Sequence, residues 1–341
     1  MGLSARTSTD VPRFNELQYL IKRFAWPGRL MTILTLVCFG LTLTGCKPPP
    51  PPDKTKLKLH IVATTSMIAD TAQEIGGDAV KVVALMGPGI DPHTYKASEG
   101  DVERLGDADL ILYNGIHLEA RMTSVFEKMR ETGHDVVAVS KDIPKSELLP
   151  IPGFPDQHDP HIWMDPDLWS KVAETIAEAI IAKKPEQEKT IRTNLEYFQG
   201  KLRMLNANIR IALDKIPPSG RVLVTAHDAF QYFGRAFNFE VKGLQGVSTA
   251  SEAGAQDVQA LATFIAERKI PAIFVESSVP RRNVEALQEA VKAKGFDVHI
   301  GRSLFSDSVG DYGTAQSTYI GMIRYNAGII GEELTPPDAK K

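Results

Sequence analysis

Three histidines in this sequence lie where predicted strands end in loops, and one aspartate occupies a similar place. His93 and His161 precede a long predicted helix, whereas His227 and Asp307 follow it. Open parallel sheets bind ligands beside the carboxyl ends of their strands, so two groups from each half could converge on one cleft. Neutral imidazole and carboxylate are ligands for Zn²⁺ or Mn²⁺. The four residues are therefore candidate ligands of a divalent metal ion.

The spacing alone leaves a second interpretation open for each histidine. The sequence contains neither HExxH nor paired CxxC motifs, and a single histidine is more often a surface residue or a satisfied polar group. We apply that interpretation to the five other histidines, His60, His117, His134, His158 and His299. His158 is the nearest of them to a candidate ligand, since it lies three residues before His161.

Metal-bound imidazoles usually donate their second N–H to a carboxylate or a carbonyl. Four aspartates are close enough in sequence to serve in this way: Asp91, Asp159, Asp165 and Asp228. Glu276, at the end of a predicted strand, either faces the same cleft or is a surface or capping carboxylate.

One predicted helix over residues 185–216 separates the two pairs of candidate ligands. Pro185 suits the first turn of a helix, and Pro217 and Pro218 end it. At 1.5 Å per residue the helix is roughly 45 Å long, more than the width of a small domain. Its apolar residues recur every three or four positions as one helical stripe, Ile191, Leu195, Phe198, Leu202, Leu205, Ile209, Leu213 and Ile216.

Strands and helices alternate on both sides of this helix. Such alternation predicts a parallel sheet whose two faces are covered by helices. We therefore predict an α/β fold of two parallel-sheet lobes, over 57–184 and 217–341, joined by the helix over 185–216, with the metal site in the cleft between the lobes. Residues 140–166 carry six prolines and are predicted to be irregular.

The first 45 residues have the basic, apolar and small-residue parts of a secretory signal. A transmembrane helix is disfavoured because the uncharged run is about 16 residues long, fewer than the roughly 20 that span a bilayer. The ending LTGC resembles the lipobox of bacterial lipoproteins, which implies a lipid on Cys46. We predict a signal peptide over 1–45 and a stiff, proline-rich spacer over 46–56.

Composition narrows the class of protein. With 341 residues, 43% of them hydrophobic, the chain is long enough for two domains. Its two cysteines are Cys38, which would leave with the signal, and Cys46, so the exported chain can form no intramolecular disulfide or thiolate cluster. Without residues 1–45 the chain keeps 34 Lys and Arg against 40 Asp and Glu, a net charge of about −6, which makes the exported protein a poor candidate for binding nucleic acid.

Four segments together resemble the signature segments of the zinc/manganese substrate-binding lipoproteins of bacterial ABC transporters. The segments are GIDPHTY at 89–95, DPHIWMDP at 159–166, TAHDAFQYF at 225–233, and FSDS at 305–308 with the residues through Tyr319. The run VKGLQGVSTASE at 241–252 is similar to the TroA-like branch of that family. The resemblance covers about residues 57–332.

This resemblance implies an extracytoplasmic, lipid-anchored protein of the periplasm or cell surface. Such a protein binds Zn²⁺ or Mn²⁺ as cargo through His93, His161, His227 and Asp307 and delivers it to a membrane permease with a cytoplasmic ATPase. His227 matches the zinc and TroA-like members, but the chain lacks the histidine-rich loop of many zinc-specific members, so the metal stays open. We expect a monomer that catalyses no reaction.

Two other functions stay open at this point. An exported zinc metallohydrolase would also need histidine and carboxylate ligands, although catalytic zinc usually has three protein ligands and keeps a position for water. A surface adhesin is the third possibility, because lipid-anchored members of the family have been regarded as adhesins.

Overall fold

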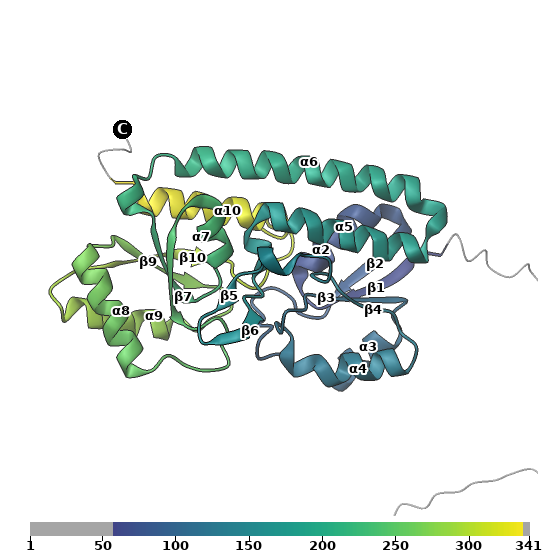
Figure 1. Ribbon diagram of the computed structural model, residues 1–341, viewed down its shortest axis with the longest axis horizontal. Helices are drawn as coiled ribbons and strands as arrows, with labels where there is room; N and C mark the ends of the chain where they lie inside the picture. The colour runs from purple at the N-terminus through teal and green to yellow at the C-terminus, as the bar shows by residue number, and fades with distance from the viewer. Residues whose placement is uncertain (1–56, 337–341) are drawn as a thin grey trace, which may run out of the picture. The chain divides into compact units, whose positions relative to one another are not determined.

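The computed structural model describes residues 57–336 (Figure 1). The predicted signal peptide over 1–45, the predicted lipid on Cys46 and the spacer over 46–56 lie outside the described residues. Within 57–336, no helix combines the length and the apolar character needed to cross a bilayer.

The N-terminal lobe is built on a four-stranded sheet in which every strand pair is parallel. In sheet order its strands are β2 (Val80–Ala84), β1 (Leu59–Ala63), β3 (Leu110–Tyr113) and β4 (Val136–Ala138). Its helices are α2 (Ser66–Gly76), α3 (Glu99–Gly106), α4 (Thr123–Glu131) and α5 (Pro166–Lys183). The branched and leucine-rich strands are almost fully buried at β1 and β3, as expected for a sheet covered on both faces.

The C-terminal lobe repeats the same topology without a sequence repeat. In sheet order its parallel strands are β8 (Glu240–Gln245), β7 (Val222–His227), β9 (Ala272–Glu276) and β10 (His299–Leu304). Its helices are α7 (Gln231–Phe237), α8 (Ala255–Arg268), α9 (Arg282–Lys292) and α10 (Tyr319–Leu334). In both lobes the second strand along the chain lies outside the first, and the third and fourth strands follow on the other side.

The two lobes are joined by α6 (Glu188–Leu213), which packs on α5 and α2 of the first lobe and on α10 of the second (Figure 1). All eight residues of the predicted apolar stripe are buried. The helix ends three residues earlier than predicted, at Leu213, and Ile216 is buried in the turn that follows. Pro217 explains the difference, because a residue before proline disfavours the helical conformation.

Each sheet separates two hydrophobic layers. One continuous core lies beneath α6 and includes side chains of α2, α5, α7 and α10. Two smaller cores cover the other faces, one under α3 and α4 and the other under α8 and α9. The largest core therefore runs through both lobes. The predicted fold, two parallel-sheet α/β lobes connected by one long helix, is confirmed.

The segment predicted to be irregular, 140–166, contains a short antiparallel hairpin of β5 (Pro150–Ile151) and β6 (Phe154–His158). Gly153 forms its turn with φ of 84°, a conformation that glycine adopts at little cost. The prolines obscured this hairpin in the sequence, because Pro150 and Pro155 lie within its strands, where proline is tolerated only at an edge.

Candidate metal centre

Four buried side chains from the two lobes converge at the carboxyl edges of the sheets. His93 lies in the loop after β2, His161 follows the β5–β6 hairpin, His227 ends β7 and Asp307 follows β10. One candidate ligand atom from each lies within 4.8 Å of all the others. None of the four side chains is more than 5% exposed. The four residues selected from the sequence therefore form one cluster.

The distances between donor atoms match a small tetrahedral site. The Nε2 atoms of His93 and His161 are 3.2 Å apart. Asp307 brings Oδ1 to 3.6 Å from His161 Nε2 and Oδ2 to 3.5 Å from His227 Nε2. Zinc bonds of about 2.0–2.2 Å would put tetrahedral donors about 3.3–3.6 Å from one another. The cluster is thus close to the size that one transition-metal ion requires.

Two of these atoms are buried and lack a hydrogen-bond partner among the described residues, His227 Nε2 and Asp307 Oδ1. Leaving a buried polar atom unpaired costs roughly 1–3 kcal/mol, and more for a charged group. Both atoms lie in the four-residue cluster. An ion bound there would remove this cost.

His161 is oriented by a carboxylate two residues before it. Asp159 Oδ1 accepts hydrogen bonds from the backbone N–H of His161, at 2.9 Å, and from its Nδ1, at 2.7 Å. Pro160 lies between them and restricts the backbone. Because Nδ1 carries the proton, the lone pair of Nε2 is available to a metal.

His227 is oriented by a carboxylate from a neighbouring strand. Glu276 ends β9, beside β7, and its Oε1 accepts the backbone N–H of His227 at 2.8 Å. Its Oε2 accepts the Nδ1 proton at 2.5 Å. Glu276 therefore faces the cleft, which was one of its two interpretations from sequence, and holds His227 with Nε2 toward the cluster.

The other two candidate ligands are positioned differently. Ser278 donates to Asp307 Oδ2 at 2.8 Å, so a hydroxyl group orients this carboxylate. Asp91 accepts the backbone N–H of His93, at 2.9 Å, instead of a ring proton. Asp91 also accepts a hydrogen bond at 2.6 Å from Thr249 of the opposite lobe, so the His93 loop is tied across the cleft.

The protonation states are unequal across the cluster. Burial lowers the pKa of His93 to about 4, so this imidazole is neutral at pH 7. Burial alone would also lower the pKa of His227, but the carboxylates of Glu276 and Asp307 outweigh burial and raise that pKa well above its usual value. Burial opposes ionisation of Asp307, yet His227 and the other imidazoles hold its pKa well below the usual range. In the absence of a metal, a protonated His227 therefore lies between the carboxylates of Glu276 and Asp307.

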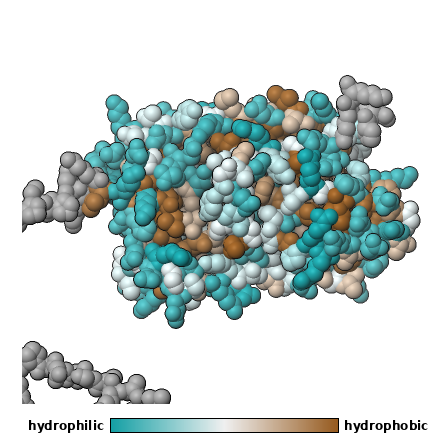
Figure 2. All heavy atoms as spheres, turned by 180° about the vertical axis from the view of Figure 1, so that it is seen from behind, coloured by the Kyte–Doolittle hydropathy of each residue, from teal (hydrophilic) through white to brown (hydrophobic). Residues whose placement is uncertain are grey.

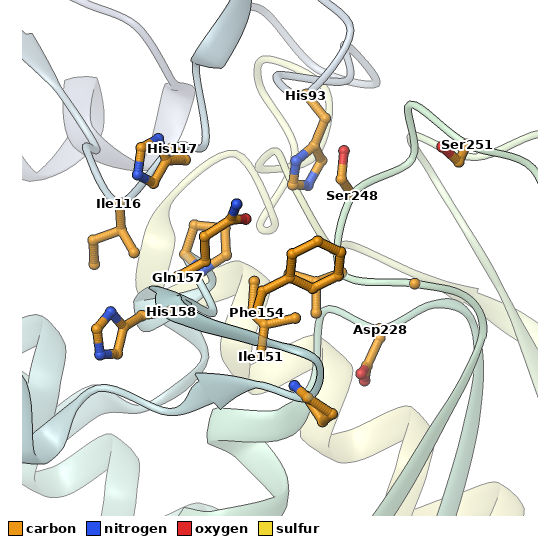
Figure 3. A pocket seen from close by; sticks show the side chains of 14 residues that line it. His93, Ile116, His117, Ile151, Phe154, Gln157, His158, Asp228, Ser248 and Ser251 are labelled. Carbon is orange, nitrogen blue, oxygen red and sulfur yellow. The ribbon is translucent and has the colours of Figure 1, made fainter.

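A cavity of about 490 Å³ opens beside His93 (Figure 3). Of the four candidate ligands, only His93 lines it, together with residues of the β5–β6 hairpin and of the loop after β8. Figure 3 shows His117 and His158 on the side of the cavity near Ile116, and Ser248 near His93. His93 therefore lies between the cluster and the cavity.

The remaining polar residues named from the sequence have other contacts. Asp165 caps α5 through the backbone N–H of Asp167 and pairs with Arg235 at 3.2 Å. Asp228 accepts from Gln231 at 2.7 Å. His117 and His158 line the cavity but lie outside the four-residue cluster.

Sequence reasoning missed Ser278, Thr249 and Glu119. Ser278 and Thr249 follow strands of the C-terminal lobe, a position that could have suggested them. Glu119 is buried and accepts hydrogen bonds from Thr64, Asn114 and Gly115. It holds a turn at the edge of the cavity in which Gly115, Ile116 and His117 all have positive φ. Positive φ in two consecutive non-glycine residues has no simple sequence signal.

The fold and the cluster define a class of protein with two α/β lobes on one long helix and a metal-sized group of ligands between them. The sequence model of the family described as "Zinc-uptake complex component A periplasmic" matches residues 61–333. The chain belongs to this family, called ZnuA.

Individual relatives span most of the chain. It is 51% identical over 270 residues to the zinc-binding protein TroA of Treponema pallidum, covering 79% of this chain and 87% of that protein. It is 43% identical over 305 residues to the manganese-binding lipoprotein MntA of Bacillus subtilis, covering 89% and 98%. It is 30% identical over 313 residues to the manganese ABC transporter substrate-binding lipoprotein PsaA of Streptococcus pneumoniae, covering 90% and 99%.

The structure of periplasmic zinc-binding protein TroA from Treponema pallidum superposes with a TM-score of 0.80 at 50% identity, covering 82% of this chain and all of that one. The family and the fold expected from the sequence are thus confirmed.

Proposed function

We propose that this protein captures Zn²⁺ or Mn²⁺ outside the cytoplasm as the substrate-binding component of an ABC importer. The observation that carries the proposal is the convergence of four buried donor groups whose spacing matches one ion. His93, His161 and His227 would each bind through Nε2, and Asp307 through its carboxylate. Membership of a family whose named relatives bind zinc or manganese supports the same cargo.

The donor set favours zinc in direct competition. Three imidazole nitrogens and one carboxylate suit tetrahedral Zn²⁺, and such sites bind Zn²⁺ more tightly than Mn²⁺ in the Irving–Williams order. Manganese would gain from a second oxygen of Asp307, since it prefers more oxygen ligands. The relatives are named for both metals, TroA for zinc and MntA for manganese.

The metal would reach the cluster past His93. The imidazole of His93 lines the cavity, whereas His161, His227 and Asp307 are at most 2% exposed. A cluster closed in this way leaves little room for a substrate beside the metal, whereas catalytic zinc keeps an open position. Binding and transport therefore account for the geometry better than hydrolysis.

Delivery would require a permease in the cytoplasmic membrane and its cytoplasmic ATPase. The PsaA relative is named as an ABC transporter component, which supports these partners. We further propose that residues 1–45 are removed as a signal and that a lipid on Cys46 anchors a monomer, with lobes over 57–184 and 217–341.

Elemental analysis of the purified protein, stripped and then reloaded with Zn²⁺ and Mn²⁺ in competition, tests this function. We expect one equivalent of metal, with zinc preferred, and a large loss in His227→Ala. His158→Ala is the matched control, because His158 lines the cavity outside the cluster and its loss should leave the stoichiometry at one. A protein that binds no stoichiometric metal, or hydrolytic activity in the loaded protein, would contradict the proposal.

A further inference from the structure

The outward face of α6 carries a line of exposed hydrophobic side chains. Tyr197, Met204 and Ile211 are 70%, 67% and 71% exposed, and they are spaced seven residues apart. Seven residues are close to two helical turns, so the three side chains lie in one row, on the side away from the core. Residues 57–336 contain eight exposed large hydrophobic side chains, and three of them form this row. Such a concentration on one helix face is unlike scattered surface exposure.

Basic side chains flank this row. Helix α6 contains five basic and two acidic residues, a net charge of +3, whereas the whole chain has a net charge of −3. Arg203 and Arg210 are exposed beside the row. Figure 2 shows a brown patch and paler tan atoms among teal ones on the upper edge, the edge that α6 occupies in Figure 1. A helix with an apolar row and basic flanks is typical of a helix that lies in the interface of an anionic bilayer.

The chain leaves the described region beside the start of this helix. Lys184, four residues before α6, donates from Nζ to the carbonyl of Leu57 at 2.7 Å. Residues 47–56 separate Leu57 from Cys46, and ten residues span at most about 35 Å. A lipid on Cys46 would therefore keep Leu57 within that distance of the bilayer, and Leu57 contacts the segment that leads into α6. The helix is about 39 Å long, and its whole outer face would contact the bilayer surface if the helix lay parallel to it.

We propose that the outward face of α6 is a docking surface for an anionic lipid bilayer. Tyr197, Met204 and Ile211 enter the boundary between the headgroups and the acyl chains, and Arg203 and Arg210 contact lipid phosphates. In Figure 1, α6 lies on the opposite side of α5 and α10 from the β5–β6 hairpin, whose residues line the cavity beside His93. Docking through α6 therefore leaves that cavity facing the medium, where metal is captured, and delivery to the permease requires the protein to leave this docked state. The proposal rests on the lipid anchor of the proposed function but does not depend on which metal is bound.

The test uses the lipid-anchored protein without residues 1–45, reconstituted into vesicles of equal parts phosphatidylglycerol and phosphatidylcholine that carry brominated acyl chains. Bromine quenches tryptophan only at short range, so Met204→Trp reports contact of α6 with the bilayer. The matched control is Tyr312→Trp, at a site of similar exposure, 73%, outside α6. Trp163 and Trp169 are fully buried and give a constant background. We expect strong quenching at position 204 and little at position 312.

The charge requirement is tested in the same vesicles. Arg203→Glu and Arg210→Glu, made in the Met204→Trp protein, should each lower the ratio of docked to undocked protein by roughly fivefold or more, since one basic residue near an anionic surface contributes about that factor. High salt or pure phosphatidylcholine should have the same direction of effect. Unchanged circular dichroism and metal stoichiometry would show that the variants remain folded.

Three results would overturn the proposal. Equal quenching at positions 204 and 312 would mean that the anchor alone brings the protein to the lipid. Absent quenching at position 204 would mean that α6 faces away from the bilayer. If the tryptophan emission of the Met204→Trp protein changed with protein concentration in detergent, without quenching in vesicles, this face would be a contact between two copies of the chain.

Discussion

The two lobes have the same strand order but orient their histidines by different means. In the N-terminal lobe, Asp159 holds His161 from two residues away in a single turn. In the C-terminal lobe, Glu276 holds His227 from the next strand of the sheet, 49 residues along the chain. Each carboxylate accepts one backbone N–H and one ring proton, but Asp159 accepts both with Oδ1 whereas Glu276 uses a separate oxygen for each.

The C-terminal half of the candidate site therefore depends on the fold as a whole, and the N-terminal half does not. The His161 arrangement needs only the backbone of 159–161, whereas the His227 arrangement requires β7 and β9 to be paired in register. The charge is also unequal, because the pKa of His227 is raised by Glu276 and Asp307 against the effect of burial. The C-terminal half of the site should therefore be the more sensitive one.

The largest effects are expected from removing one histidine of each lobe. His161→Ala and His227→Ala should each weaken metal binding by more than about 100-fold, since even the loss of a residue that orients a ligand costs 10–100-fold. His227→Ala should also destabilise the metal-free protein, by about 3 kcal/mol, because it removes the positive charge between Glu276 and Asp307. Calorimetric titration and thermal unfolding would measure both quantities. Equal stability of the two metal-free variants would contradict the proposed asymmetry.

Replacing the two orienting carboxylates tests the comparison directly. Glu276→Gln should weaken metal binding by about 10–100-fold: its two oxygens each accept one bond, so an amide that keeps the backbone bond must donate to Nδ1, which favours the tautomer with the proton on Nε2. Asp159→Asn should weaken binding less, because Oδ1 alone accepts both hydrogen bonds and an amide oxygen can do the same. We expect Asn at position 159 to be tolerated better, since Asn supports the same local turn. Competition with a chelator of known affinity would rank the two variants. A larger loss of metal affinity in Asp159→Asn would show that the N-terminal half of the site is the more sensitive one.

A smaller effect is expected at Ser278, which donates to Asp307. Ser278→Ala should weaken metal binding roughly threefold to tenfold, because Asp307 keeps its place in the cluster but loses one hydrogen bond to a charged oxygen. Thr249→Val is the matched change on the His93 side, since Thr249 contacts Asp91 and not a ligand ring. It should cost less than Ser278→Ala in the same titration, and an equal or greater loss would show that the His93 loop limits affinity.

The sequence predicted the local parts of this site better than the distant ones. His93, His161, His227 and Asp307 could be selected because each follows a recognisable strand or proline-bounded turn. Asp159 could be named as a partner because it lies two residues from His161. Glu276 could be given only as one of two alternatives, since no pattern in its own segment indicates that β9 lies beside β7.

For the fold as well, the sequence predicted local features better than contacts between distant segments. The eight apolar residues of α6 predicted a long helix and its buried face, because helical periodicity is local. The β5–β6 hairpin was missed because its prolines argue against strands, and its two-stranded pairing depends on packing beside the cavity. The sequence predicted that both sheets are parallel. It did not predict their identical strand order, because contacts between residues far apart in sequence set that order.

The smallest effect on metal binding is expected at a contact between the lobes that lies away from the cluster. Asp70 of α2 accepts the backbone N–H of Tyr319, at the start of α10, at 2.8 Å. Burial raises the pKa of Asp70 to about 6, although the hydrogen bond from Tyr319 opposes the shift. Because the folded pKa exceeds the unfolded value of 3.8, the native state binds this proton more tightly. The stabilising effect of that proton is complete below pH 3.8 and is lost as the pH rises through about 6.

Asp70→Asn should therefore raise the free energy of unfolding at pH 7, by about 1–2 kcal/mol, and change it little near pH 4, as measured by urea unfolding of the metal-free protein. Asn keeps an oxygen that can accept from Tyr319, so the contact between the lobes should persist. Metal affinity should be unchanged, because both orienting carboxylates belong to the same lobe as the histidine they hold. If Asp70→Asn weakened metal binding, the packing of one lobe on the other, and not the partner of each histidine, would control the site.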